Sequence, residues 1–219
     1  MMSKATILLA ALAGLTFFSA TAQAQDAAAG EKKAAMCIGC HGIKGYQASF
    51  PEVHKVPMIS GQGAKYIVAS LQAYKRGERK HPTMRGISTT LTDADMADLA
   101  AYYETHGASS VKPVADAPAA APSPEVAELL TKGACASCHG ANYSKPIDPG
   151  YPKLAGQHAD YLSVALRAYA TTGNAKVGRS NAIMAGQVKQ FKPAELKAMA
   201  AYIGSLPGDL RTVPQPKFK

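Results

Sequence analysis

The sequence predicts an all-α fold built from two similar halves. Apolar side chains recur at three- and four-residue spacing in several segments, which is the period of an amphipathic helix. No alternating pattern of useful strand length occurs in the 219 residues. Motifs and single residues also repeat at offsets of 95 to 100 positions, so we expect one domain to be present twice.

The composition is that of an ordinary globular protein. Hydrophobic residues make up 47% of the chain, and the formal net charge is +9. No apolar run approaches the roughly 20 residues that a membrane-spanning helix needs, so we do not expect an integral membrane protein. The basic excess favours acidic partners or surfaces.

The first 24 residues have the layout of a secretory signal peptide. Lys4 precedes the apolar run 7–18, and the small-residue site Ala22-Gln23-Ala24 follows it. A short buried helix would explain neither flank. We therefore expect residues 1–24 to direct export, which separates the protein from nucleic acid.

In the first half we expect three helices. The segment 26–35 precedes the first cysteine motif. The middle helix carries apolar and aromatic residues at helical spacing and ends near Gly77; they are Tyr66, Ile67, Leu71 and Tyr74, with Ser70 on the same face. The last helix opens at Thr92 with Asp95 at its third position, a variant of the capping box. The buried face of this helix should consist of Leu99, Tyr102 and Tyr103.

The second half repeats this pattern. Ser123 and Pro124 predict the start of a helix that continues as far as Cys135. The middle helix ends near Gly173 and carries Tyr161, Leu162, Ala165, Leu166 and Tyr169. The last helix opens with Pro193 and Glu195 and should bury Met199, Tyr202, Ile203 and Leu206.

A proline-rich segment separates the halves. Pro113, Pro118 and Pro122 stand among Ala and Ser in the stretch 107–124, which cannot continue a helix and is typical of a semi-rigid linker. We expect domains at residues 25–108 and 124–219, joined by a linker at 109–123.

All four cysteines lie in two C-x-x-C-H motifs. The motifs are Cys37-Ile38-Gly39-Cys40-His41 and Cys135-Ala136-Ser137-Cys138-His139. This spacing is the signature of covalent c-type haem attachment, in which two thiols add to the haem vinyl groups and the adjacent histidine binds the iron. We therefore expect two covalently bound haem c groups.

Two other interpretations of these motifs are weaker. A zinc ribbon places its C-x-x-C pairs about 15 to 20 residues apart, whereas 94 residues separate Cys40 from Cys135. A thioredoxin-like motif needs strands alternating with helices around it, and the sequence is helical throughout.

The repeat also selects candidates for the second axial iron ligand. Among the methionines, only Met84 and Met184 occupy equivalent positions in the two halves, at an offset of 100. Each lies between the middle and last helices, where we expect a loop that folds over the open haem face. A lone methionine often fills a core instead, and His81 is the nearest rival ligand.

A second group must hold the free ring nitrogen of each proximal histidine. Pro57 and Pro152 begin the repeated Pro-x-x-x-Gly-Gln segments, so their carbonyl oxygens are the expected acceptors. The alternative is that these prolines only mark the start of a helix.

With these motifs, both methionines and the Gly-Gln segments, the chain resembles the dihaem class I cytochromes c of the cytochrome c4 family. The resemblance covers both halves and the linker. It implies two tandem class I cytochrome c domains related by pseudo-two-fold symmetry, with haem propionate edges facing each other. It also implies iron ligation by His41 with Met84 and by His139 with Met184.

The resemblance further implies a periplasmic carrier of single electrons. Donors would be cytochrome bc1-type complexes or dehydrogenases, the acceptor would be a terminal oxidase, and the protein would associate loosely with the membrane. Alternatives are an electron-accepting subunit of a periplasmic dehydrogenase and a dihaem peroxidase. A peroxidase needs an open iron position and a nearby acid or base, so the paired methionines favour a carrier without catalytic residues.

Charge differs between the halves. Residues 111–219 carry 13 basic and 7 acidic groups, against 10 and 8 in residues 25–110. The second half is therefore the expected face for an acidic partner or membrane surface, although a merely solvated face would look the same.

Overall fold

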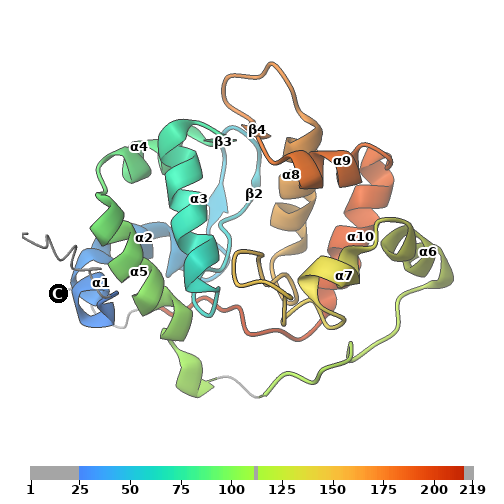
Figure 1. Ribbon diagram of the computed structural model, residues 1–219, viewed down its shortest axis with the longest axis horizontal. Coiled ribbons are helices and arrows are strands. Elements are labelled where there is room, and N and C mark those ends of the chain that lie inside the picture. The colour runs from blue at the N-terminus through green and yellow to red at the C-terminus, as the bar shows by residue number, and fades with distance from the viewer. Residues whose placement is uncertain (1–24, 111–112, 215–219) are drawn as a thin grey trace, which may run out of the picture.

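The computed structural model describes residues 25–110 and 113–214, and it shows two helical halves lying side by side (Figure 1). The expected signal peptide lies outside the described residues. Among those residues, no helix has the length and apolar character needed to cross a membrane.

The first half contains these helices in the described part of the chain: α1 (Ala27–Lys33), α2 (Ala35–His41), α3 (Ala64–Arg76), α4 (Pro82–Thr89), α5 (Asp93–Thr105) and a 3-10 turn at Ala108–Ser110. The second half contains α6 (Pro124–Lys132), α7 (Cys135–His139), α8 (Ala159–Ala170), α9 (Ala182–Val188) and α10 (Pro193–Ser205). The fold is all-α, and the strands in the described residues are only two residues long: β1 (Gln47–Ala48), β2 (His54–Lys55), β3 (Arg79–Lys80) and β4 (Gly178–Arg179).

Local chemistry sets several helix ends where the sequence predicts them. The capping box of α5 is formed, with Thr92 Oγ1 accepting from Asp95 N and Asp95 Oδ2 accepting from Thr92 N. Helix α3 is followed by its C-cap, Gly77, which has a φ of 78°, a left-handed conformation that glycine adopts without strain.

Each half has its own apolar core, and the cores use equivalent positions. Met96, Leu99 and Ala100 of α5 are almost fully buried, as are their counterparts Leu196, Met199 and Ala200 of α10. The predicted buried faces are largely confirmed, but Tyr102 and Tyr202 are only partly buried.

The prediction of three helices per half is wrong, because short helices occupy segments expected to be loops. The helix expected to run into Cys135 ends at Lys132, since Ala134 has a φ of 45°, in the left-handed region that interrupts a helix. Helix α8 ends at Ala170, before the expected boundary at Gly173.

The two halves are joined by backbone pairing and polar contacts. Strands β3 and β4 pair antiparallel across the halves, with Arg79 opposite Arg179. Asp160 Oδ2 accepts from Lys55 N at 3.0 Å, and Arg167 forms an ion pair with Glu52.

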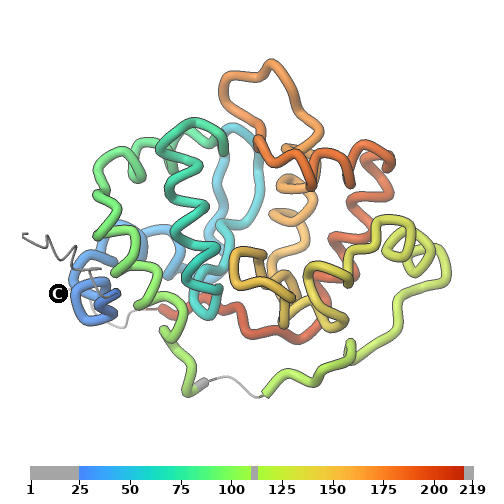
Figure 2. The backbone as a smooth tube through the Cα atoms, viewed as in Figure 1, coloured from blue at the N-terminus to red at the C-terminus, as the bar shows by residue number. Residues whose placement is uncertain are grey.

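The C-terminal segment also crosses back to the first half. Figure 2 shows it running from the end of α10 beneath the first half. Arg211 N donates to Ser60 O at 3.1 Å, and Arg211 Nε donates to His106 O at 2.8 Å. Arg211 therefore links the C-terminal segment to the end of α5 and to the loop that precedes α3.

Candidate functional site

The two cysteine motifs lie in short helices at equivalent places in the halves. Helix α2 carries Cys37, Cys40 and His41, and α7 carries Cys135 and its neighbours. A spacing of three residues places both thiols of a motif on one side of its helix. None of the four thiols is in a disulfide, and burial raises the pKa of Cys37 to about 11. Burial also raises the pKa of Cys135, so the first thiol of each motif is held in its neutral form.

The histidine of each motif is held by the expected proline carbonyl. His41 Nδ1 lies 2.7 Å from Pro57 O, and His139 Nδ1 lies 3.1 Å from Pro152 O. Burial lowers the pKa of both imidazoles, although the carbonyl contacts act in the opposite direction. A neutral ring that donates from Nδ1 keeps a lone pair on Nε2, which is the atom free to bind a metal.

Met84 and Met184 lie in helices rather than in loops, which corrects the prediction. Both segments form short helices because a side chain caps each start: His81 Nδ1 accepts from Met84 N at 3.4 Å, and Asn181 Oδ1 accepts from Met184 N at 2.9 Å. His81, the rival ligand, therefore caps the helix that carries Met84.

A single continuous cavity of about 570 Å³ connects these groups. Its lining includes the cysteines and histidines of both motifs and both paired methionines. Apolar core residues such as Leu99 and Ile203 complete its wall. The eight side chains predicted from the sequence therefore face one shared space.

A half-buried cluster of arginines and tyrosines, which the sequence analysis missed, also lines the cavity. We call it the arginine cluster: Arg79, Arg179, Tyr66 and Tyr161. The Tyr161 hydroxyl accepts from Arg79 Nη2 at 2.7 Å and from Arg179 Nη2 at 3.1 Å. Arg79 Nη1 donates to Tyr66 Oη at 3.2 Å. Because Arg79 belongs to the first half and Arg179 to the second, the cluster spans the interface.

The charge of the arginine cluster is not balanced by a side-chain carboxylate. Neither guanidinium forms an ion pair with another described residue, and Arg79 Nε is buried without a partner. Burial acts to raise the pKa of Tyr161, but the positive charges of Arg179 and Arg79 outweigh it and lower this pKa to about 8. The positive charge of the arginine cluster thus favours an anionic group in this part of the cavity.

These features fit a haem in each half. Paired thiols suit thioether attachment, while imidazole and thioether side chains suit the two axial positions of haem iron. Haem also carries two carboxylates, which match the unpaired guanidinium groups at the interface. Arg79 and Arg179 recur at an offset of 100, and Tyr66 and Tyr161 at 95, so the repeat marks these residues as equivalent but does not show that they meet at the interface.

Comparisons with known proteins agree with this geometry. The family model described as "Cytochrome c" matches twice, at residues 27–106 and 124–207. Cytochrome c4 of Azotobacter vinelandii is 32% identical over 94% of this chain and its own full length. A thiosulfate dehydrogenase electron acceptor of Thiomonas intermedia is 35% identical over 92% of this chain and 91% of its own.

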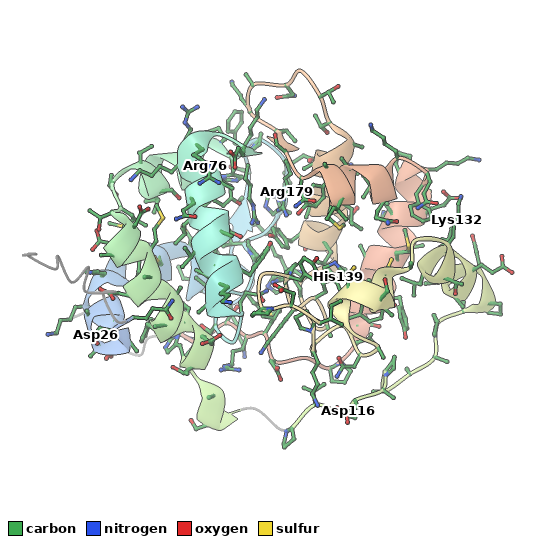
Figure 3. All side chains as sticks on the ribbon, viewed as in Figure 1. Asp26, Arg76, Asp116, Lys132, His139 and Arg179 are labelled. Atoms are coloured by element: carbon green, nitrogen blue, oxygen red, sulfur yellow. The ribbon has the colours of Figure 1, made fainter. Side chains whose placement is uncertain are left out.

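A solved structure shows the same arrangement. Reduced cytochrome c4 from Pseudomonas stutzeri superposes with a TM-score of 0.60 at 30% identity, covering 84% of this chain and all of the other. Figure 3 labels His139 and Arg179 in the middle of the molecule, in the region where the halves meet.

Proposed function

Because the chain belongs to the cytochrome c4 family of electron carriers with two covalently bound haem c groups, we propose that it shuttles single electrons in the periplasm between respiratory donors and a terminal oxidase. The observation that carries the proposal is the duplicated set of cysteines, histidine and methionine around one shared cavity.

The ligand set follows from that duplication. Cys37 and Cys40 would attach the first haem, and His41 and Met84 would bind its iron. In the second half Cys135 and Cys138 would attach the haem, and His139 and Met184 would bind its iron. In support, each set lines the cavity and comes from equivalent helices.

The chain's residues prepare the cofactor for electron transfer. Haem iron supplies a one-electron couple, and methionine ligation raises its potential relative to ligation by two histidines. Pro57 and Pro152 fix the histidine rings, so little rearrangement accompanies a change of charge. The cavity walls are mostly apolar, and the arginine cluster would offset negative charge at the interface.

The proposal also covers the cellular location of the protein and its redox partners. The layout of residues 1–24 supports export to the periplasm, with the domains at 25–108 and 124–219 and the linker at 109–123. Electrons would arrive from cytochrome bc1-type complexes or dehydrogenases, with the basic second half supporting peripheral association with an acidic membrane surface.

A second candidate is an electron-accepting partner of a periplasmic dehydrogenase. The similarity to a thiosulfate dehydrogenase electron acceptor favours it. The two candidates share the same electron-transfer site and differ only in the donor.

Replacement of each methionine tests the proposed ligand set. Met84→His should lower one reduction potential and leave the other nearly unchanged, and Met184→His should lower the other, because a second imidazole stabilises oxidised iron. The measurement is a spectroelectrochemical titration. The control is Met36→Leu, which changes a cavity-lining methionine that has no equivalent in the other half. Unchanged titration curves in both histidine variants would reject the ligand set.

A further inference from the structure

Two buried glutamines, Gln62 and Gln157, each form hydrogen bonds with the backbone of the opposite half. We call this pair the glutamine clasp. They are 5% and 4% exposed. Gln157 Oε1 accepts from Met58 N at 3.0 Å, and its Nε2 donates to Met58 O at 2.9 Å. Gln62 Oε1 accepts from Lys153 N at 2.9 Å, and its Nε2 donates to Lys153 O at 3.0 Å.

The clasp binds the same peptide groups that hold the proximal histidines. Met58 N and Pro57 O belong to one peptide group, whose oxygen lies 2.7 Å from His41 Nδ1. Lys153 N and Pro152 O belong to another, whose oxygen lies 3.1 Å from the histidine of the second motif. Each glutamine is therefore connected through one peptide group to the histidine of the opposite half.

We propose that each glutamine is a positioning residue for the haem of the other half. Gln157 acts on His41, and Gln62 acts on His139. This inference rests on the proposed function, because it requires both histidines to be iron ligands.

The physical basis is polarisation along a chain of hydrogen bonds. An amide N–H that donates a hydrogen bond makes its own carbonyl a better acceptor. A better acceptor at Nδ1 makes the imidazole a more basic ligand, which favours oxidised over reduced iron. Each glutamine should therefore lower the reduction potential of the haem across the interface.

A purely structural role makes a different prediction. Gln62 Oε1 also accepts from Gly63 N, and Gln157 Oε1 also accepts from His158 N, each at 3.0 Å at the start of α3 or α8 in its own half. If the glutamines serve only these helix starts, their loss should perturb their own half. The proposal predicts that the effect crosses the interface.

The test is a pair of variants, Gln157→Leu and Gln62→Leu, with the potential of each haem measured separately. The Met84→His and Met184→His proteins identify which titration wave belongs to which haem. Gln157→Leu should raise the potential of the first haem, with an equilibrium constant for reduction changed about twofold to fourfold, the size expected from losing a cooperative bond. This corresponds to ~20 to 35 mV. Gln62→Leu should raise the potential of the second haem by a similar amount.

A second readout is the Nδ1 proton resonance of each proximal histidine in the reduced protein. In Gln157→Leu the His41 proton should move upfield as its hydrogen bond weakens, while the His139 proton stays in place. Gln62→Leu should show the reverse. Shifts in the variant's own half, or equal shifts in both halves, would overturn the proposal.

Gln157→Glu provides a variant of the same length if leucine prevents folding. Glutamate retains an acceptor for Met58 N and adds negative charge, so the potential of the first haem should fall more than that of the second. An equal fall, or a larger fall in the second haem, would contradict the proposal. If instead the Met→His variants leave the titration unchanged, the ligand set itself is wrong, so the two failures are distinguishable.

Discussion

Tyr161→Phe removes the one hydroxyl that both interface arginines share. Its oxygen accepts from Arg79 Nη2 at 2.7 Å and from Arg179 Nη2 at 3.1 Å, so its loss leaves two charged donors each short of a partner. A hydrogen bond to a charged group contributes about 1.5 to 3 kcal/mol. Arg79 keeps its bond to Ser70 Oγ at 2.8 Å, which reduces the loss. We therefore expect the free energy of unfolding to fall by about 2 kcal/mol, less than the roughly 3 to 6 kcal/mol that two such bonds would contribute together.

The assay is chemical and thermal unfolding of the holoprotein, followed by circular dichroism and haem absorbance. A loss of this size should lower the melting temperature by about 4 to 8 °C for a chain of this length. Tyr66→Phe is the matched control, because Tyr66 is the equivalent residue in the first half and accepts only one bond, at 3.2 Å, from Arg79. Its effect should be less than half as large. Equal losses of stability in the two variants, or no loss in Tyr161→Phe, would refute the claim that this hydroxyl stabilises the contact between the halves.

Two further predictions concern charge. Electron transfer with an acidic partner should slow as ionic strength rises, since the second half carries 13 basic and 7 acidic groups; stopped-flow rates that do not depend on salt would contradict this. Lys33 Nζ contacts Asp95 Oδ1 at 2.7 Å and Asp98 Oδ2 at 2.8 Å and lowers the pKa of both carboxyl groups. Their stabilisation is present above the unfolded-state pKa near 4 and is lost as pH falls below it. The stability difference between wild type and Lys33→Ala should therefore shrink between pH 5 and about pH 2, and an acid titration showing a constant difference would reject the prediction.

Features encoded by local chemistry could be predicted from the sequence. The capping box at Thr92 and the left-handed glycine at the end of α3 depend on neighbouring residues, and both are formed as expected. The proline carbonyls that hold the two histidines were also predicted, because the repeat places them at equivalent positions. The cysteine motifs identified the cofactor because their spacing has few other uses.

Other features depend on tertiary contacts and had no clear local signal. Helices α4 and α9 have eight and seven residues, too few to show a helical period, and the caps from His81 and Asn181 help them to form. The arginine cluster and the glutamine clasp arise where the halves meet. Their residues do repeat in the sequence, but the repeat alone does not show which half each side chain contacts.

A carbon monoxide difference spectrum of the reduced protein tests most directly whether both irons are saturated by protein ligands. Reduced haem iron binds carbon monoxide only where its sixth position is open or easily vacated. We expect no spectral change, because Met84 and Met184 would occupy both positions. A change approaching one haem per chain would contradict it and would point to an open site of the kind that a peroxidase requires.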